Sequence, residues 1–129
     1  MKIFNLAAAV AMVALSSGAV AQTKFGASMR WCGSSPEFKL SGVPKGTASL
    51  ELRMVDLDVP GYPHGGGDVA YQTGQNVIEC SDVSRASMGR YQGPAPPAGQ
   101  VHTYQWTIKA LDAKGVVLGQ AVTQRKFPE

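Results

Sequence analysis

ASLELRMVD, residues Ala48 to Asp56, alternates apolar and polar side chains more clearly than any other early stretch of the chain. Leu50, Leu52 and Met54 fall on one face, because successive side chains of a strand point to opposite sides. The same parity, continued, places Asp56 and then Asp58 on that apolar face. An unpaired carboxylate is costly to bury. Asp56 therefore either lines a polar pocket at the end of a sheet or lies where the strand has ended in a turn.

A second strand is predicted over Val101 to Leu111, VHTYQWTIKAL. Its even positions share one face, which is apolar towards the C-terminal end and aromatic and polar towards the N-terminal end: His102, Tyr104, Trp106, Ile108 and Ala110. This strand, like the first, therefore runs from a core into a polar environment.

The rest of the chain also favours strands. Glycine and proline recur about every 8 to 12 residues, which is typical of a β-sandwich, and no segment has a sustained helical period. Further strands are predicted near Phe25–Met29, Glu37–Leu40 and Val116–Thr123, the last after a hairpin turn at Asp112–Gly115. The sequence predicts an all-β, antiparallel β-sandwich with few or no helices.

Residues 1–21 are predicted to form a secretory signal peptide. Lys2 supplies the positive start, Leu6–Leu15 is uncharged and apolar, and Ala19–Ala21 is a small-x-small cleavage site. The apolar stretch is shorter than the roughly 20 residues that span a bilayer. We expect residues 22–129 to be one exported domain, periplasmic or secreted, without a transmembrane segment.

Cys32 and Cys80 are the two cysteines of the chain. An even number in an exported chain favours one disulfide, and no Cys-x-x-Cys spacing supports a redox pair. We therefore predict a structural disulfide between them.

The charge pattern excludes one class of partner. The formal net charge is +3, and removing Lys2 with the signal peptide leaves +2. The basic residues are scattered and form no stripe or aromatic-interleaved run, so nucleic acid is not an expected partner. Mild positive charge is compatible with a small anion.

Three segments have the composition of a ligand pocket: Asp56–Pro60 with the following His64–Gly67, Tyr91–Gly99, and His102 with Tyr104. Glycines let a ligand approach the backbone, and prolines stiffen a rim. Histidine and tyrosine provide donors.

These runs resemble a known family. SPEFKLSGVPKGTASLELRMVDLDVP, HGGG and YQGPAPPAGQVHTYQWTIKALDA are similar to the phosphatidylethanolamine-binding protein family, and within it to the bacterial branch named Raf-kinase-inhibitor-like. The resemblance covers Ser35 to about Gly119. It implies an antiparallel β-sandwich with a pocket at one end that takes phosphate, acetate-like anions or phospholipid head groups. We expect no enzymatic activity and no cofactor.

The resemblance also implies roles for individual residues. The Asp-Pro-Asp-x-Pro motif falls on Asp56–Pro60, with Asp56 as the pocket carboxylate and Asp58 and Pro60 as structural support of the loop. The implied ligand-binding set is Asp56, His64, Gly93, Pro96, Pro97, His102 and Tyr104. Strand parity had already placed Asp56, His102 and Tyr104 on inward faces.

The chain departs from the family pattern at three places. Leu57 stands where the family usually has proline, and Ala95 replaces a residue of the proline rim that is often cysteine. The segment after Leu111 is too short for the helix that full-length relatives place there. We expect a shortened fold with a more open pocket.

Alternative interpretations remain open for single residues. His64 beside three glycines also suits a solvated loop, and His102 suits a core histidine bonded to backbone. Asp58 also suits a turn residue that caps its own backbone.

Other functions are also open. The His64–Gly67 run is similar to the oxyanion-hole motif of lipases, but the chain has no Gly-x-Ser-x-Gly elbow. His64, His102, Asp56 and Asp58 are residue types that suit zinc, although we expect no metal. An interaction module that inhibits an unknown protein partner is the alternative to anion binding.

Overall fold

The computed structural model describes residues 22–84, 88 and 90–129. The predicted signal peptide, residues 1–21, lies outside this part of the chain. Among the described residues, no helix is long and apolar enough to cross a membrane.

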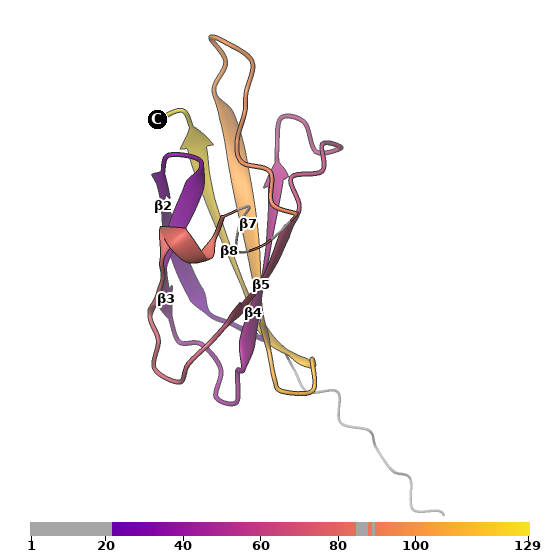
Figure 1. Cartoon of the computed structure of the whole chain (residues 1–129). Helices are drawn as coiled ribbons and strands as arrows, with labels where there is room; N and C mark the ends of the chain where they lie inside the picture. The colour runs from indigo at the N-terminus through magenta and orange to yellow at the C-terminus, as the bar shows by residue number, and fades with distance from the viewer. Residues whose placement is uncertain (1–21, 85–87, 89) are drawn as a thin grey trace, which may run out of the picture.

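Two sheets face each other across one core (Figure 1). The larger has the order β1 (Thr23–Lys24), β8 (Val117–Phe127), β7 (His102–Leu111), β4 (Ser49–Asp56) and β5 (Gly66–Ala70). The smaller has the order β2 (Gly26–Cys32), β3 (Ser35–Ser41) and β6 (Val77–Ile78). Neighbouring strands are antiparallel except for the parallel pair of β1 and β8. Helical structure in the described residues is limited to the 3-10 turn η1 (Cys80–Asp82) and Met88. The predicted all-β sandwich is confirmed.

The core follows the alternation that the sequence predicts for β4 and β7. Every even position from Leu50 to Asp56 and from His102 to Ala110 is buried. Trp106 of β7 packs edge-on against Phe38 of β3, with ring centroids 5.3 Å apart, so it joins the two sheets. The predicted strand faces are therefore confirmed.

The register of β4 and β7 brings the polar ends of both strands together. Asp56 is the last residue of β4 and lies opposite Tyr104, while His102 is the first residue of β7. Because the strands are antiparallel, the loop that follows β4 and the proline segment that precedes β7 leave the sheet at the same end (top of Figure 1). His102 also pairs with Phe127, near the end of β8.

The glycines after His64 have a different role from the one expected. A Cβ on Gly66, whose φ is +154°, would lie 1.8 Å from the carbonyl oxygen of Leu52 in β4. A Cβ on Gly65 would lie 2.5 Å from the carbonyl oxygen of Arg90. Both glycines let two stretches of this chain approach each other. The expectation that they make room for a ligand is wrong at these two positions.

A tight hairpin turn joins β7 to β8 at the opposite end of the molecule (Figure 1). Asp112 Oδ1 accepts hydrogen bonds from the backbone N–H groups of Lys114 and Val116, each at 2.9 Å. Gly115 has a φ of +81°, which favours glycine. The predicted hairpin is confirmed, and β8 continues beyond the predicted end at Thr123 as far as Phe127.

The predicted disulfide is present. It joins Cys32 at the end of β2 to Cys80 at the start of η1, with the two Cα atoms 6.2 Å apart. Neither cysteine among the described residues is free.

Candidate functional site

The polar ends of β4 and β7 form part of one hollow of about 230 Å³. Asp56 comes from β4, His102 and Tyr104 come from β7, and His64 comes from the loop between β4 and β5. All four sequence-predicted polar groups therefore line the same cavity. The other residues of its wall are Val59, Tyr62, Ala95 and Pro97.

Asp56 and His102 form a buried pair in the wall of this pocket. The Nδ1–H of His102 donates to Oδ2 of Asp56 at 2.6 Å, and the side chains are only 5 % and 8 % exposed for Asp56 and His102, respectively. Oδ1 of Asp56 accepts the N–H groups of Asp58 at 2.8 Å and Val59 at 3.2 Å. Burial acts to raise the pKa of the Asp56 carboxyl, but the hydrogen bonds from His102 and the two N–H groups outweigh it and hold the pKa below its ordinary value.

Asp58 braces the loop rather than lining the pocket. Its side chain is exposed, because β4 ends at Asp56 and the strand parity goes no further. Oδ2 of Asp58 accepts the backbone N–H of Thr103 at 2.8 Å and so ties the loop to β7. The acid that caps the turn is Asp56. Pro60 is exposed within the same turn.

His64 is buried and holds two loops together. Its Nδ1–H donates to the carbonyl oxygen of Gln92 at 2.8 Å, and the N–H of Gln92 donates to the carbonyl oxygen of His64 at 2.8 Å. His64 is 3 % exposed, so the solvated-loop interpretation is wrong. A carbonyl oxygen only accepts, so Nδ1 carries a hydrogen and the neutral ring has a lone pair at Nε2. Within the described residues, no hydrogen bond reaches that Nε2.

Tyr104 supplies a buried hydroxyl that makes no hydrogen bond of normal length and angle among the described residues, although Asp56 and the backbone of Ala95 lie close enough to shift its pKa. Burial, followed by the negative charge of Asp56, raises the pKa of this hydroxyl to about 12. The group therefore remains a protonated donor at neutral pH. Its ring lies between the two imidazoles, edge-on to His64 at 5.4 Å and stacked near His102 at 6.4 Å.

A second layer of aromatic rings fixes the position of Tyr104. Trp31 of β2 packs edge-on against Tyr104 at 5.9 Å and against Phe127 at 5.4 Å. The indole N–H of Trp31 donates to the carbonyl oxygen of Lys126 at 3.0 Å. The smaller sheet thus supports the pocket from behind.

The proline segment contributes less to the pocket than the sequence suggests. Pro97 and Ala95 line it. Gly93 instead lines a neighbouring hollow of about 610 Å³, which shares Tyr62 and Ala95 with the first. Pro96 is half-buried and lines neither of these two hollows. Of the three expected rim residues, the fold brings only Pro97 to the four polar groups.

Sequence reasoning missed several residues of the site. Tyr62 lines the pocket and donates its hydroxyl to Gln92 Oε1 at 2.9 Å, and no sequence signal distinguishes it. Gln100 Oε1 lies 2.8 Å from Nε2 of His102. No sequence signal distinguishes Gln100 either, because it lies in the turn before β7.

The acids and one histidine also have the composition of a metal site. Ligand atoms of Asp56, Asp58 and His102 all lie within 4.8 Å of one another. However, both oxygens of Asp56, Oδ2 of Asp58 and both nitrogens of His102 already take part in hydrogen bonds within the protein. The carboxylate oxygens keep further lone pairs, but a cation could bind His102 only by displacing Asp56 or Gln100, so the arrangement does not favour a metal held by all three residues.

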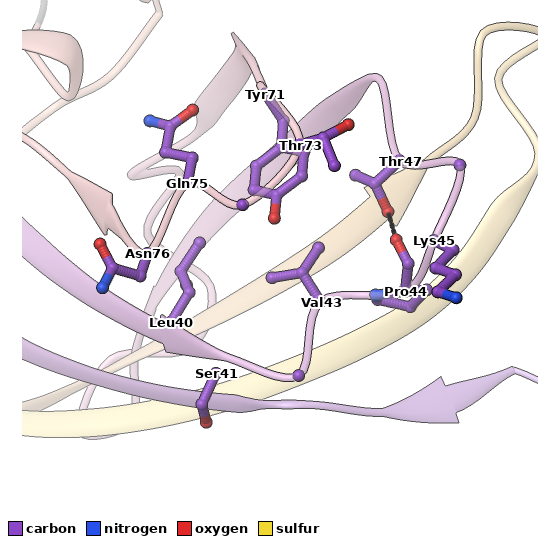
Figure 2. A pocket seen from close by; sticks show the side chains of 13 residues that line it. Leu40, Ser41, Val43, Pro44, Lys45, Thr47, Tyr71, Thr73, Gln75 and Asn76 are labelled. Carbon is purple, nitrogen blue, oxygen red and sulfur yellow. Dashed lines mark hydrogen bonds between the residues drawn. The ribbon is translucent and has the colours of Figure 1, made fainter.

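A larger hollow of about 350 Å³ lies at the other end of the molecule (Figure 2). The turn between β3 and β4 and the residues after β5 form its wall, and Tyr71 extends towards Val43. Lys45, which is exposed, is the only charged residue of the wall. Among its described lining residues the buried polar group is Thr47, whose hydroxyl already donates to the carbonyl oxygen of Pro44 at 2.7 Å.

Comparisons with known proteins agree with the resemblance seen in the sequence. A family model described as phosphatidylethanolamine-binding protein matches residues 14–129, which include every residue of the pocket. No curated protein matches the chain. The chain belongs to the phosphatidylethanolamine-binding protein family.

Proposed function

We propose that the chain binds a small anion, such as phosphate or a phosphorylated head group, reversibly in the pocket of Asp56, His64, His102 and Tyr104. The observation that supports this most is the buried Tyr104 hydroxyl without a partner among the described residues. Buried polar groups are almost always hydrogen-bonded. An open donor in a pocket wall is therefore suited to an acceptor oxygen of a ligand.

The local charges support an anion rather than a cation. The carboxylate of Asp56 is turned towards His102 and the N–H groups of its own turn, which compensate its charge. Nε2 of His64 becomes a second donor when the ring is protonated. A volume of about 230 Å³ suits a small group, since drug-sized pockets begin at about 300 Å³.

Calorimetric titration with dimethyl phosphate, which keeps a single charge, tests this proposal. The wild type should bind it measurably near neutral pH, and the absence of any heat of binding would contradict the proposed function.

Tyr104→Phe is expected to separate binding from stability. Removing the hydroxyl should weaken dimethyl phosphate binding by about tenfold or more, the value of a hydrogen bond to a charged group. The free energy of unfolding should stay nearly unchanged, because the lost hydroxyl makes no hydrogen bond of normal geometry among the described residues. Urea denaturation and calorimetry on the same samples check both halves. Unchanged affinity would remove Tyr104 from the binding site.

The lining also supports binding without catalysis. Among the described residues, neither serine nor cysteine lines the pocket, so a common type of covalent nucleophile is missing from its wall.

We extend the proposal to the Raf-kinase-inhibitor-like branch and to an exported location, periplasmic or secreted. The disulfide supports the location, because disulfides persist in oxidising compartments. Cell fractionation tests the exported location, and N-terminal sequencing of the exported protein should find Gln22 as the first residue.

A protein-interaction module is the second candidate. Four exposed apolar side chains lie on the segments around the pocket, a surface composition that suits a protein contact: Leu57, Val59, Tyr62 and Val101. Co-purification from the native compartment tests this candidate. A stoichiometric partner that survives His102→Ala would favour interaction over anion binding.

A further inference from the structure

The chain directly before β7 is fixed by a tight turn. The N–H of Gln100 donates to the carbonyl oxygen of Pro97 at 3.0 Å, and Gly99 has a φ of +79°. Gln100 lies two positions before His102, outside β7, so this turn rather than the strand sets its position. The side chain of Gln100 reaches His102, with Oε1 2.8 Å from Nε2.

This contact uses the remaining nitrogen of His102. Nδ1 is bonded to Asp56 and Nε2 to Gln100, so neither nitrogen is free for a ligand. Two other polar groups of the pocket differ, because Nε2 of His64 and the hydroxyl of Tyr104 have no such bond within the described residues. The pocket thus has two open polar groups and one that is closed by the protein itself.

We propose that Gln100 is an internal competitor that closes Nε2 of His102 and determines which ligands reach it. An amide has an acceptor end and a donor end, so it can bond to the protonated or the neutral ring. A neutral ligand gains little by replacing the amide. An anionic oxygen forms a charge-assisted bond about twice as strong and displaces it. This selectivity rests on the proposed anion-binding function, whereas the closing of Nε2 does not.

The closing can be tested without any ligand. The chain has two histidines, so the carbethoxylation of each by diethyl pyrocarbonate can be followed separately by mass spectrometry. Gln100→Ala should raise the rate of carbethoxylation at His102 roughly two- to tenfold, which is equivalent to the loss of one net hydrogen bond. The rate at His64 should stay the same. Gln100→Glu keeps an acceptor and should leave His102 slow. An unchanged rate at His102 in Gln100→Ala overturns the proposal.

Gln105→Ala is the matched control. Gln105 is on the outward face of β7, where its Oε1 accepts a hydrogen bond from Gln124. This variant should be carbethoxylated at His102 at the same rate as the wild type. A rise at His102 in both glutamine variants would indicate a general loosening of β7 and contradict a specific role for Gln100.

The ligand test separates this inference from the proposed function. Dimethyl phosphate should bind Gln100→Ala roughly two- to tenfold more tightly than the wild type, and neutral trimethyl phosphate should gain affinity as well. Weaker binding of dimethyl phosphate would make Gln100 a ligand contact and overturn the competitor role. If no variant binds dimethyl phosphate while labelling of His102 rises, the closing of Nε2 is supported and the proposed function fails.

Discussion

Asp56→Ala is expected to lower the free energy of unfolding by about 3 to 5 kcal/mol, because it leaves a buried imidazole without its partner. The carboxylate also accepts the N–H groups of Asp58 and Val59, which lose their acceptor in the variant. Urea denaturation near neutral pH measures the loss.

Two further variants make this prediction specific. Asp68→Ala removes an exposed acid of β5 and should cost less than about 1 kcal/mol. His102→Ala combined with Asp56→Ala should cost clearly less than the sum of the two single changes, because both remove the same pair. If Asp56→Ala costs no more than Asp68→Ala, the pair contributes nothing to stability.

The lowered pKa of Asp56 defines the pH range in which its interactions stabilise the folded protein. Its pKa in the folded protein lies below the ordinary value, so the unfolded chain takes up the proton first as pH falls. The stabilisation is therefore complete above the unfolded value of about 3.9 and is lost as pH falls through the lower folded pKa. Asp56→Ala should flatten this part of the stability curve.

Removing the disulfide is the second change with a large expected effect. Cys32 and Cys80 are 48 positions apart, and a bond across a loop of this length stabilises by about 4 kcal/mol on the chain-entropy model. The variant with Cys32→Ser and Cys80→Ser should lose about that much in urea denaturation.

The reduced wild type provides the control for this variant. It has the same open loop with almost the same side chains, so its unfolding midpoint should approach that of the double serine variant. A wild type that unfolds at the same urea concentration with and without reductant would show that the bond adds no stability.

The fold was predictable where strands alternate, and not where they are short or glycine-rich. β4 and β7 have apolar residues at every second position, so their faces and their shared end follow from parity. β5 begins with Gly66 and Gly67, and it exists because glycine lets it lie close to β4. No side-chain pattern marks such a strand. β1 and β6 have two residues each, too few for any alternation.

The same distinction applies to the candidate site. Asp56, His102 and Tyr104 followed from strand parity, whereas His64 needed the family resemblance. Gly93 and Pro96 did not reach the hollow of these four groups, because their places depend on the path of a loop rather than on a strand. Gln100 lies before the first residue of β7, so its contact with His102 depends on a turn and did not follow from parity.

The turn between β7 and β8 has a practical consequence. β7 has 10 residues, so the turn lies about 30 Å along the strand from His102. Ala113 and Lys114 are exposed, and exposed loop tips accept inserted sequence. An affinity handle or a fluorescent domain inserted there would attach the protein to a surface by one end, with the mouth of the pocket facing the solution.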